Sequence, residues 1–294
     1  MKIGVTFPQN EIGPDPIVLR DYAQAVEDLG FDHILAYDHV VGADVSTRPD
    51  WGQRYTSEAQ FHEPFVMFGY MAAFTSKVEF VTGILILPQR QTVLVAKQAA
   101  EVDILSNGRL RLGVGLGWND VEYEALGENF HNRGRRIEEQ IDVLRRLWTE
   151  PIVDYTGKWH RIDRAGLNPM PVQQPIPIFM GGLSEPVLER AARIADGWFP
   201  IVGGAEALES LPGRIAGLRE AVRGHGRDPE AFEIRVQTGF GSKAPDEWAK
   251  DVDMYRDMGV DYLCFSTMRS GLTNPRDHID ALKRYKDAVG SLTR

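Results

Sequence analysis

The stretch SNGRLRLGVGLGWNDVEYEALGENFHNRGRR, residues 106–136, decides the fold more than any other part of the chain. A β-branched and leucine run, Leu110 to Val114, passes into a loop with glycines at positions 113, 115 and 117. Glycine lets a backbone turn sharply and come close to a ligand. The stretch therefore predicts a strand, a ligand-contacting turn and then a helix.

Short apolar runs alternate with amphipathic segments along the rest of the chain. The predicted strands cover residues 3–7, 33–37, 78–87, 110–114, 176–180, 197–201, 233–238 and 262–266. The predicted helices cover residues 18–29, 65–75, 93–105, 135–148, 186–195, 205–223, 246–258 and 276–289. Eight strand–helix units favour an α/β fold, the (β/α)8 TIM barrel, whose site lies at the carboxyl ends of the strands. We expect residues 1–294 to form a single domain of this kind.

Two segments are too long to be plain connections. Residues 38–62 follow the second strand, and we expect this polar loop to cover a site. Residues 151–175 come after the fourth strand and its helix, and IVDYTGKWHRI predicts a hairpin that turns at Thr156-Gly157. We therefore expect insertions after strands 2 and 4.

The acidic composition limits the partners of the chain. A net charge of -9 and a pI near 5.3 argue against nucleic acid or an anionic membrane as the main partner, so a small-molecule substrate fits better. The lone Cys264 excludes an internal disulfide, and its apolar surroundings predict a reduced core thiol. The apolar run at the N-terminus is too short for a signal peptide, and no run approaches the ~20 residues of a membrane span. These features predict a cytoplasmic enzyme.

One acid–histidine pair, Asp38-His39, stands at a predicted strand end. Histidine donates or accepts a proton near neutral pH, which makes His39 the first candidate for a catalytic group. A hydrogen-bonded structural histidine is the competing interpretation. No metal site is expected, because no histidine–carboxylate cluster has ligand spacing. The glycines near position 115 match neither a P-loop nor a dinucleotide fingerprint.

A second glycine motif lies after the fifth predicted strand. Gly181 and Gly182 precede Ser184, a candidate N-cap, and Pro186 in the first turn of a helix. Backbone N–H groups at such a helix start can bind a phosphate without any basic side chain. An ordinary glycine-containing loop explains the same residues, and both readings stay open.

Two further clusters have both a structural and a functional interpretation. Arg133, Arg135 and Arg136 can reach an anion, but Glu138 and Glu139 follow directly, which favours a salt-bridged structural cluster. The aromatic side chains of Trp51, Phe61 and Phe65 can face a flat ring or pack beneath the long loop.

Several segments in their order along the chain resemble the bacterial luciferase-like family. They are LAYDHV at 35–40, the run from TGILILPQRQ through GVGLGWNDVEYEALG at 82–127, R-G-x-R at 133–136, PIFMGG at 177–182 and ADGWF at 195–199. The resemblance covers nearly the whole chain and is strongest to the branch of F420-dependent oxidoreductases. It implies a (β/α)8 barrel that binds coenzyme F420 or FMN.

The resemblance also assigns roles to particular residues. The third strand of F420-dependent members contains a bulge with a cis non-proline peptide behind the deazaflavin ring, and Gly83-Ile84 matches it. By the same resemblance, Asp38 and His39 stand beside the ring. The remaining cofactor contacts implied by the resemblance come from Gly115, Leu116, Gly117, Asn119, Gly181 and Gly182. Gly83→Val is expected to weaken cofactor binding more than folding.

The sequence departs from this pattern at one position. The best-known F420 dehydrogenases have a glutamate just after the Gly-x-Gly of strand four, where this chain has Trp118. The acid partner of His39 therefore cannot be transferred. Glu122, four positions on, is expected to be structural.

Three functions follow from these residues. The leading one is an F420-dependent oxidoreductase that transfers a hydride to or from an organic substrate, with His39 managing the proton. The alternative is an FMN-dependent monooxygenase that receives reduced flavin from a separate reductase, and the third is a non-catalytic cofactor-binding protein. The apolar run PFVMFGYMAAF at 64–74 is compatible with a homodimer interface or with plain core.

Overall fold

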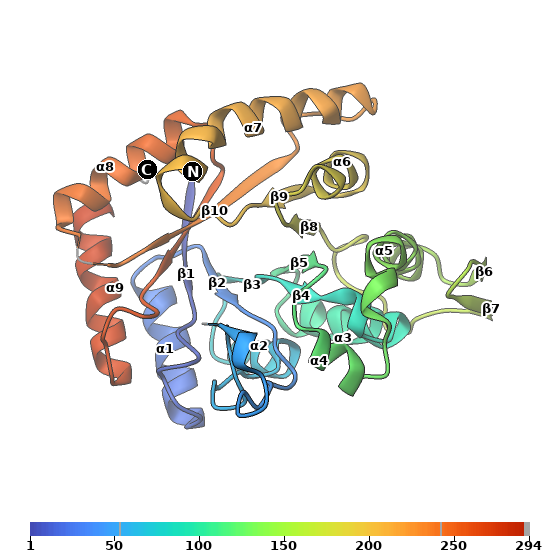
Figure 1. The fold of residues 1–294 in the computed structure, drawn as a ribbon, viewed down its shortest axis with the longest axis horizontal. Coiled ribbons are helices and arrows are strands. Elements are labelled where there is room, and N and C mark those ends of the chain that lie inside the picture. Colours follow the sequence, from blue (N-terminus) through green and yellow to red (C-terminus); the bar gives the residue numbers. More distant parts are fainter. Residues whose placement is uncertain (53, 242, 291–294) are drawn as a thin grey trace.

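The computed structural model describes residues 1–52, 54–241 and 243–290 and shows a closed parallel barrel (Figure 1). Each strand pairs in parallel with the next, and pairing of β3 with β5 closes the ring. The barrel strands are β1 (Lys2–Thr6), β2 (His33–Ala36), β3 (Glu79–Thr82), β5 (Leu110–Gly115), β8 (Ile178–Gly181), β9 (Gly197–Phe199), β10 (Glu233–Gly239) and β11 (Tyr262–Ser266). The predicted (β/α)8 fold is confirmed.

Helices lie outside the strands and cover the barrel (Figure 1). They are α1 (Pro16–Asp28), α2 (Pro64–Ala72), α3 (Thr92–Leu105), α5 (Arg133–Thr149), α6 (Glu185–Ile194), α7 (Gly204–Gly224), α8 (Pro245–Asp257) and α9 (Pro275–Val289). Proline in the first turn marks the start of several of them, since its missing N–H has no helical partner there. Their apolar faces and the outward side chains of the strands form the main core.

Both predicted insertions are present. After β2 the chain runs through a long loop containing the 3-10 turn η1 (Pro49–Trp51) before it reaches α2. After β5 it forms α4 (Asp120–Ala125), η3 (Phe130–Asn132) and α5, and then the hairpin of β6 (Val153–Thr156) and β7 (Arg161–Ala165). This hairpin projects away from the barrel (Figure 1). The short helix α4, between β5 and α5, was not among the predicted helices.

The predicted third strand, residues 78–87, is interrupted. It ends as β3, resumes as β4 (Leu85–Ile86) and passes into the 3-10 turn η2 (Leu87–Gln89). The interruption falls at Gly83–Ile84, whose peptide bond is cis as the resemblance implied.

No helix in the described part of the chain combines the length and apolar composition needed to cross a membrane.

A buried histidine lies at the N-terminal end of the barrel. The ring of His33 in β2 occupies the space where a side chain at Gly4 would stand, and His33 is 2% exposed. Burial lowers the pKa of His33 well below its usual 6.5, and the nearby charges of Arg235 and Lys2 lower it further. His33 is therefore neutral in the folded protein at neutral pH.

This histidine is expected to make stability depend on pH. The unfolded chain binds a proton at His33 below about pH 6.5 and the folded chain does not, so stability is fully present above that pH and is lost as the pH falls, by up to about 1.4 kcal/mol per pH unit. Urea unfolding of the wild type and His33→Leu between pH 7.5 and 5 measures the difference. Parallel pH profiles of the two proteins would contradict the assignment.

Candidate active site

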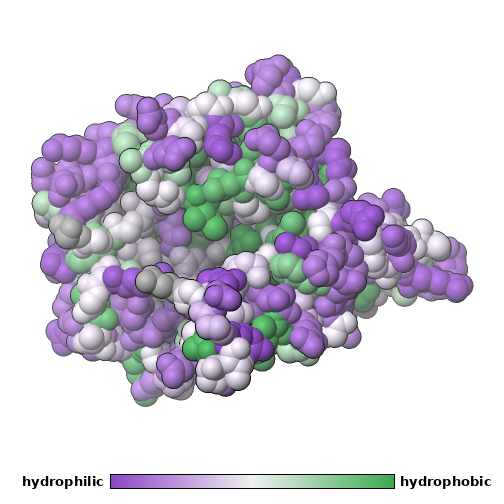
Figure 2. All heavy atoms as spheres, viewed as in Figure 1, coloured by the Kyte–Doolittle hydropathy of each residue, from purple (hydrophilic) through white to green (hydrophobic). Residues whose placement is uncertain are grey.

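The carboxyl ends of the barrel strands meet at one rim, and most of the residues singled out in the sequence lie there. Inside the rim a cavity of about 280 Å3 is lined by Tyr37, Gln237 and Met268 among others. The Nε2 of Gln237 donates to Thr6 Oγ1 at 2.8 Å, and burial raises the pKa of Tyr37. Figure 2 shows a hollow near the middle of one face, with hydrophobic residues on its wall. The rim therefore offers a partly apolar recess.

The side chain of Ile84 is held between glycines on two neighbouring strands. A Cβ atom added to Gly181 would come within 2.9 Å of Ile84 Cγ2, and one added to Gly115 would overlap Ile84 Cδ1. Gly117, at φ +66°, leaves room for Ile86 in the same way, with 2.8 Å to its Cγ2. These glycines were expected to contact a cofactor. The space above them is instead filled by side chains that follow β3.

Gly83 faces protein as well. A Cβ atom at this position would come within 2.5 Å of the Leu35 side chain, which is fully buried inside the barrel. Gly83→Val would therefore disturb the barrel before any ligand binds. We therefore expect Gly83→Val to weaken folding as well as cofactor binding.

His39 is paired with a buried carboxylate that sequence reasoning assigned to a structural role. Its Nδ1 lies 3.3 Å from Oε2 of Glu122, which is 1% exposed. The other oxygen, Oε1, accepts from the N–H groups of Val40 and Val41. Helix α4 supplies Glu122. This residue, four positions after Trp118, is therefore the acidic partner of His39 that the sequence did not identify.

The charge state of Glu122 follows from these contacts. Burial alone would raise the pKa of this carboxyl. Hydrogen bonds from His39, Val40 and Val41 outweigh the burial and lower the pKa below its usual 4.5. An ionised carboxylate can only accept, so the proton of a neutral His39 stands on Nδ1 and leaves Nε2 as a base.

Aromatic rings surround this histidine. Phe61 meets the His39 ring edge-on with centroids 4.7 Å apart, and Tyr55 and Trp118 each lie 5.5 Å from it. Trp51 packs against Trp118, so the aromatics of the long loop wall in His39. Phe65, the third aromatic considered in the sequence, is part of the main core.

The Asp38 side chain is buried in an ion pair with Arg90 and does not line the cavities at the rim. Its side chain is 0% exposed and accepts from Arg90 Nη2 at 2.6 Å and from the Ile86 N–H at 3.0 Å. A direct contact of this carboxylate with a cofactor would require Arg90 to leave. In this structure Asp38 positions Arg90, and its place beside a cofactor ring stays a prediction.

Asn119 and Leu116 are also occupied by the protein. The Asn119 side chain caps α4, where Oδ1 accepts from the Glu122 N–H and Nδ2 donates to the Val41 carbonyl, each at 3.4 Å. Leu116 packs against the main core, and its carbonyl accepts from the Tyr123 hydroxyl at 2.7 Å. Both residues hold α4, and thus Glu122, in place.

Two helix starts lie near each other after β8 and β9. Ser184 is the N-cap of α6, as predicted, but its hydroxyl makes no capping bond within the described chain. Gly203 is the N-cap of α7, and a Cβ atom there would meet nothing within 4 Å. A cavity of about 220 Å3 between them is lined by Leu183, Gly203 and Arg214 among others. Backbone N–H groups at helix starts suit a phosphate.

Sequence reasoning missed Arg214 at this cavity. Its Nη1 donates to the Leu183 carbonyl at 3.2 Å across the loop that holds Gly182.

Of the arginines that were considered in the sequence, Arg136 is paired with Glu128 near α5. Its structural interpretation therefore holds. No group of three or more His, Cys, Asp or Glu residues in the described ranges is placed to hold a metal ion.

The family model of luciferase-like monooxygenases matches residues 3–287. The chain belongs to the luciferase-like family. An uncharacterized Mycobacterium tuberculosis protein is 35% identical to it over 219 residues, 73% of this chain and 74% of that protein. The FMNH2-dependent dimethylsulfone monooxygenase of Pseudomonas fluorescens is 32% identical over 237 residues, 79% of this chain and 59% of that protein.

Solved structures share the fold of this luciferase-like protein. Monooxygenase RslO1 from Streptomyces bottropensis superposes with a TM-score of 0.83 at 19% identity, over 100% of both chains. An F420-dependent secondary alcohol dehydrogenase in complex with an F420-acetone adduct gives 0.78 at 20% identity, over 98% of both chains. Both superpositions show the shared (β/α)8 barrel.

Proposed function

We propose that this luciferase-like protein is an F420-dependent oxidoreductase that transfers a hydride to or from an organic substrate. The pairing of His39 with Glu122 at the end of β2 carries the proposal. Hydride transfer to a carbonyl, or from an alcohol, requires a proton to move at the neighbouring oxygen. A histidine whose Nδ1 is fixed by a buried carboxylate is suited to that task.

The residues at the rim fit a cofactor of this type. The half-buried side chain of Ile84 offers an apolar contact to a ring, and the starts of α6 and α7 offer N–H groups to a phosphate. When bound, F420 supplies or accepts the hydride. His39 Nε2 would take the proton from a substrate hydroxyl, or return it in the reverse direction, and Glu122 would stabilise the imidazolium.

A specific observation favours a second candidate. The relative with a named activity at 32% identity is an FMNH2-dependent monooxygenase, although the match spans 59% of its length. In that case a separate reductase would supply the reduced flavin. The same rim would serve, since FMN also has a flat ring and a phosphate. A non-catalytic cofactor-binding protein is the third candidate.

Parallel titration of the purified protein with F420 and FMN, followed by cofactor fluorescence at fixed salt, separates the first two. Micromolar binding of F420 with little for FMN supports the proposal, and the reverse supports the monooxygenase. Riboflavin serves as the control ligand for phosphate binding, because it has the ring of FMN but lacks its phosphate. If neither cofactor binds, the proposal is wrong.

We also propose that two copies associate through α2 and α3. Val66 and Phe74 on and just after α2 are 71% and 37% exposed, and Leu105 at the end of α3 is 55% exposed. Leu105 lies against α2 at Gly69, so these apolar side chains belong to neighbouring helices. Such a group on a surface favours burial against a partner.

A single charge on this face is expected to separate the copies. Val66→Glu would place a carboxylate in the apolar contact, where it has no partner. Sedimentation equilibrium of both proteins measures the change from dimer to monomer, with exposed Gln24→Glu on α1 as the matched control. A wild type that sediments as a monomer at all concentrations would refute the interface.

A further inference from the structure

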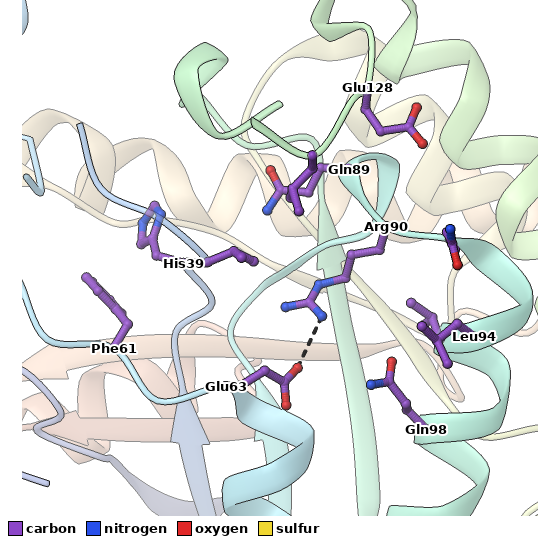
Figure 3. A pocket seen from close by; sticks show the side chains of 12 residues that line it. His39, Phe61, Glu63, Gln89, Arg90, Leu94, Gln98 and Glu128 are labelled. Atoms are coloured by element: carbon purple, nitrogen blue, oxygen red, sulfur yellow. Dashed lines mark hydrogen bonds and ion pairs between the residues drawn. The ribbon is translucent and has the colours of Figure 1, made fainter. Parts of the chain in front are cut away.

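A cavity of about 500 Å3 borders His39 on the side of α3 (Figure 3). The long loop contributes Phe61 and Glu63, and α3 contributes Leu94 and Gln98. Its size is that of sites that take small organic molecules. In Figure 3 the side-chain amide of Gln89 points toward His39 across this space.

Gln89 is buried without a partner. It is 2% exposed, and neither its Nε2 nor its Oε1 has a hydrogen-bond partner within the described residues. A buried amide left unpaired costs free energy, so nearly all such groups are bonded in native proteins. Two open hydrogen-bonding atoms on one side chain that lines a cavity indicate a ligand group that pairs with both.

A neighbouring glutamine shows the contrast. Gln140 on α5 is 0% exposed, and its Nε2 donates to Leu87 O, Arg90 O and Thr92 Oγ1 at 3.0–3.2 Å. Gln140 therefore stabilises η2 and the start of α3. Gln89 sits on the same turn, yet its amide makes none of these structural contacts.

The charged side chains that line the cavity beside Gln89 argue against an anion as the preferred ligand. Arg90 is the one permanent cation among the described lining residues, and it is paired with Asp38 at 2.6 Å and Glu63 at 3.1 Å. Glu128 is paired with Arg136. No positive charge in this described lining is left for a carboxylate or phosphate. A cationic group offers only donors, whereas the Gln89 amide has both an open donor and an open acceptor, so the group that meets it is neutral.

We propose that Gln89 binds a neutral group with a donor beside an acceptor, and holds it next to His39. A glutamine amide pairs through two hydrogen bonds with a primary amide, a lactam or the pyrimidine edge of a flavin-type ring. Gln89 is thus a specificity-determining residue. Its placement of a reacting molecule at His39 rests on the proposed function, whereas the pairing itself does not.

The side-chain resonances of Gln89 provide the test. In protein labelled with 15N-glutamine, the Gln89 amide signal is identified by its absence in Gln89→Met, a substitution that keeps the length of the side chain. Benzamide is titrated as the substrate-like probe, acetophenone as the analogue that has the acceptor without the donor, and F420 and FMN as the cofactor probes.

Benzamide is expected to shift the Gln89 signal and to bind about tenfold more weakly in Gln89→Met, as loss of such a pair implies. Acetophenone should bind both proteins about equally. A shift caused by F420 or FMN instead assigns the paired edge to the cofactor ring. If no probe shifts the signal, or every affinity is unchanged in Gln89→Met, the proposal is overturned.

Thermal unfolding separates this role from a structural one. Gln89→Met should leave the Tm unchanged or higher, because no protein group loses a partner. Gln140→Met should lower it by about 5 °C, because the hydrogen bonds of Gln140 Nε2 to Leu87, Arg90 and Thr92 are lost. An equal loss in both variants contradicts the proposal. A benzamide response in a protein that binds neither cofactor would refute the proposed function and leave this inference standing.

Discussion

Gly115→Ala is expected to lower the free energy of unfolding by about 1–2 kcal/mol, because the new methyl group would overlap Cδ1 of Ile84 and force that side chain to another rotamer. Both residues lie at the rim, where β5 and β8 enclose the Ile84 side chain. The barrel wall on that side is β-sheet, which cannot move without losing its ladder to β8. Urea unfolding at pH 7.5 measures the loss.

A second substitution is expected to restore the stability. Ile84→Val removes the Cδ1 atom that clashes and by itself costs about 1 kcal/mol. The double variant Gly115→Ala with Ile84→Val should therefore be more stable than Gly115→Ala alone, and the cycle should give a coupling above about 1 kcal/mol. Additive effects would show that Ile84 does not fill the space above Gly115.

Gly113→Ala is the matched control for this cycle. Its Cβ atom would overlap the backbone carbonyl of Thr82, while Ile84 Cγ2 would lie at an ordinary 3.6 Å. The loss of stability should be at least as large as in Gly115→Ala, because a backbone atom cannot rotate away. Ile84→Val should not relieve it.

The fold could be predicted because periodicity reports which face of each element is apolar. Residues 33–36 and 262–266 are buried on both faces, as in a parallel sheet covered by helices. Helix starts could be predicted because proline and capping residues mark them. The break at Gly83–Ile84 came from family resemblance, since nothing in the local pattern of residues 78–87 interrupts the strand.

The candidate site could be predicted only in part. Glycines were expected to face a ligand, but the sequence does not tell which side chain lies above a glycine, and Ile84 comes from the break between β3 and β4. The pairing of His39 with Glu122 joins residues 83 positions apart. The signal that could have found it is the acidic first turn of α4 directly after the glycine loop, where a helix aims its side chains back at the rim.

Asp38 is a second residue whose contacts could not be predicted from the sequence. An acid next to a histidine at a predicted strand end indicated chemistry at both residues, yet both lie in the loop beyond β2 and contact different groups, Arg90 for Asp38 and Glu122 for His39. The pair therefore separates. His39 faces the cavities at the rim, and Asp38 holds Arg90 beneath it.

His39→Ala is expected to lower the rate of substrate turnover by about 10²–10⁴-fold, the usual contribution of a positioned acid or base. The binding of cofactor should change little, because His39 supplies a proton site rather than a phosphate or ring contact. Stopped-flow absorbance of the bound cofactor with a substrate that the wild type turns over measures the rate. Added imidazole should restore part of it.

The control for this substitution is His131→Ala. His131 is an exposed histidine on η3 whose ring meets Phe130 and not His39. Its removal should leave the rate within about twofold of the wild type, as expected of a surface residue far from the reacting atoms. An equal loss in both variants would point to a general effect on folding.

Glu122→Gln tests how the carboxylate positions His39. The amide oxygen can still accept from Val40 and Val41, so the loop should keep its structure. The amide nitrogen would donate to Nδ1 and move the imidazole proton to Nε2, the wrong place for a base. We expect about a 10²-fold loss in kcat with little change in KM or Tm, since only the tautomer changes. An unchanged rate in both His39→Ala and Glu122→Gln would show that the pair moves no proton during turnover. Cofactor binding without turnover in the wild type and in both variants would favour the non-catalytic cofactor-binding protein.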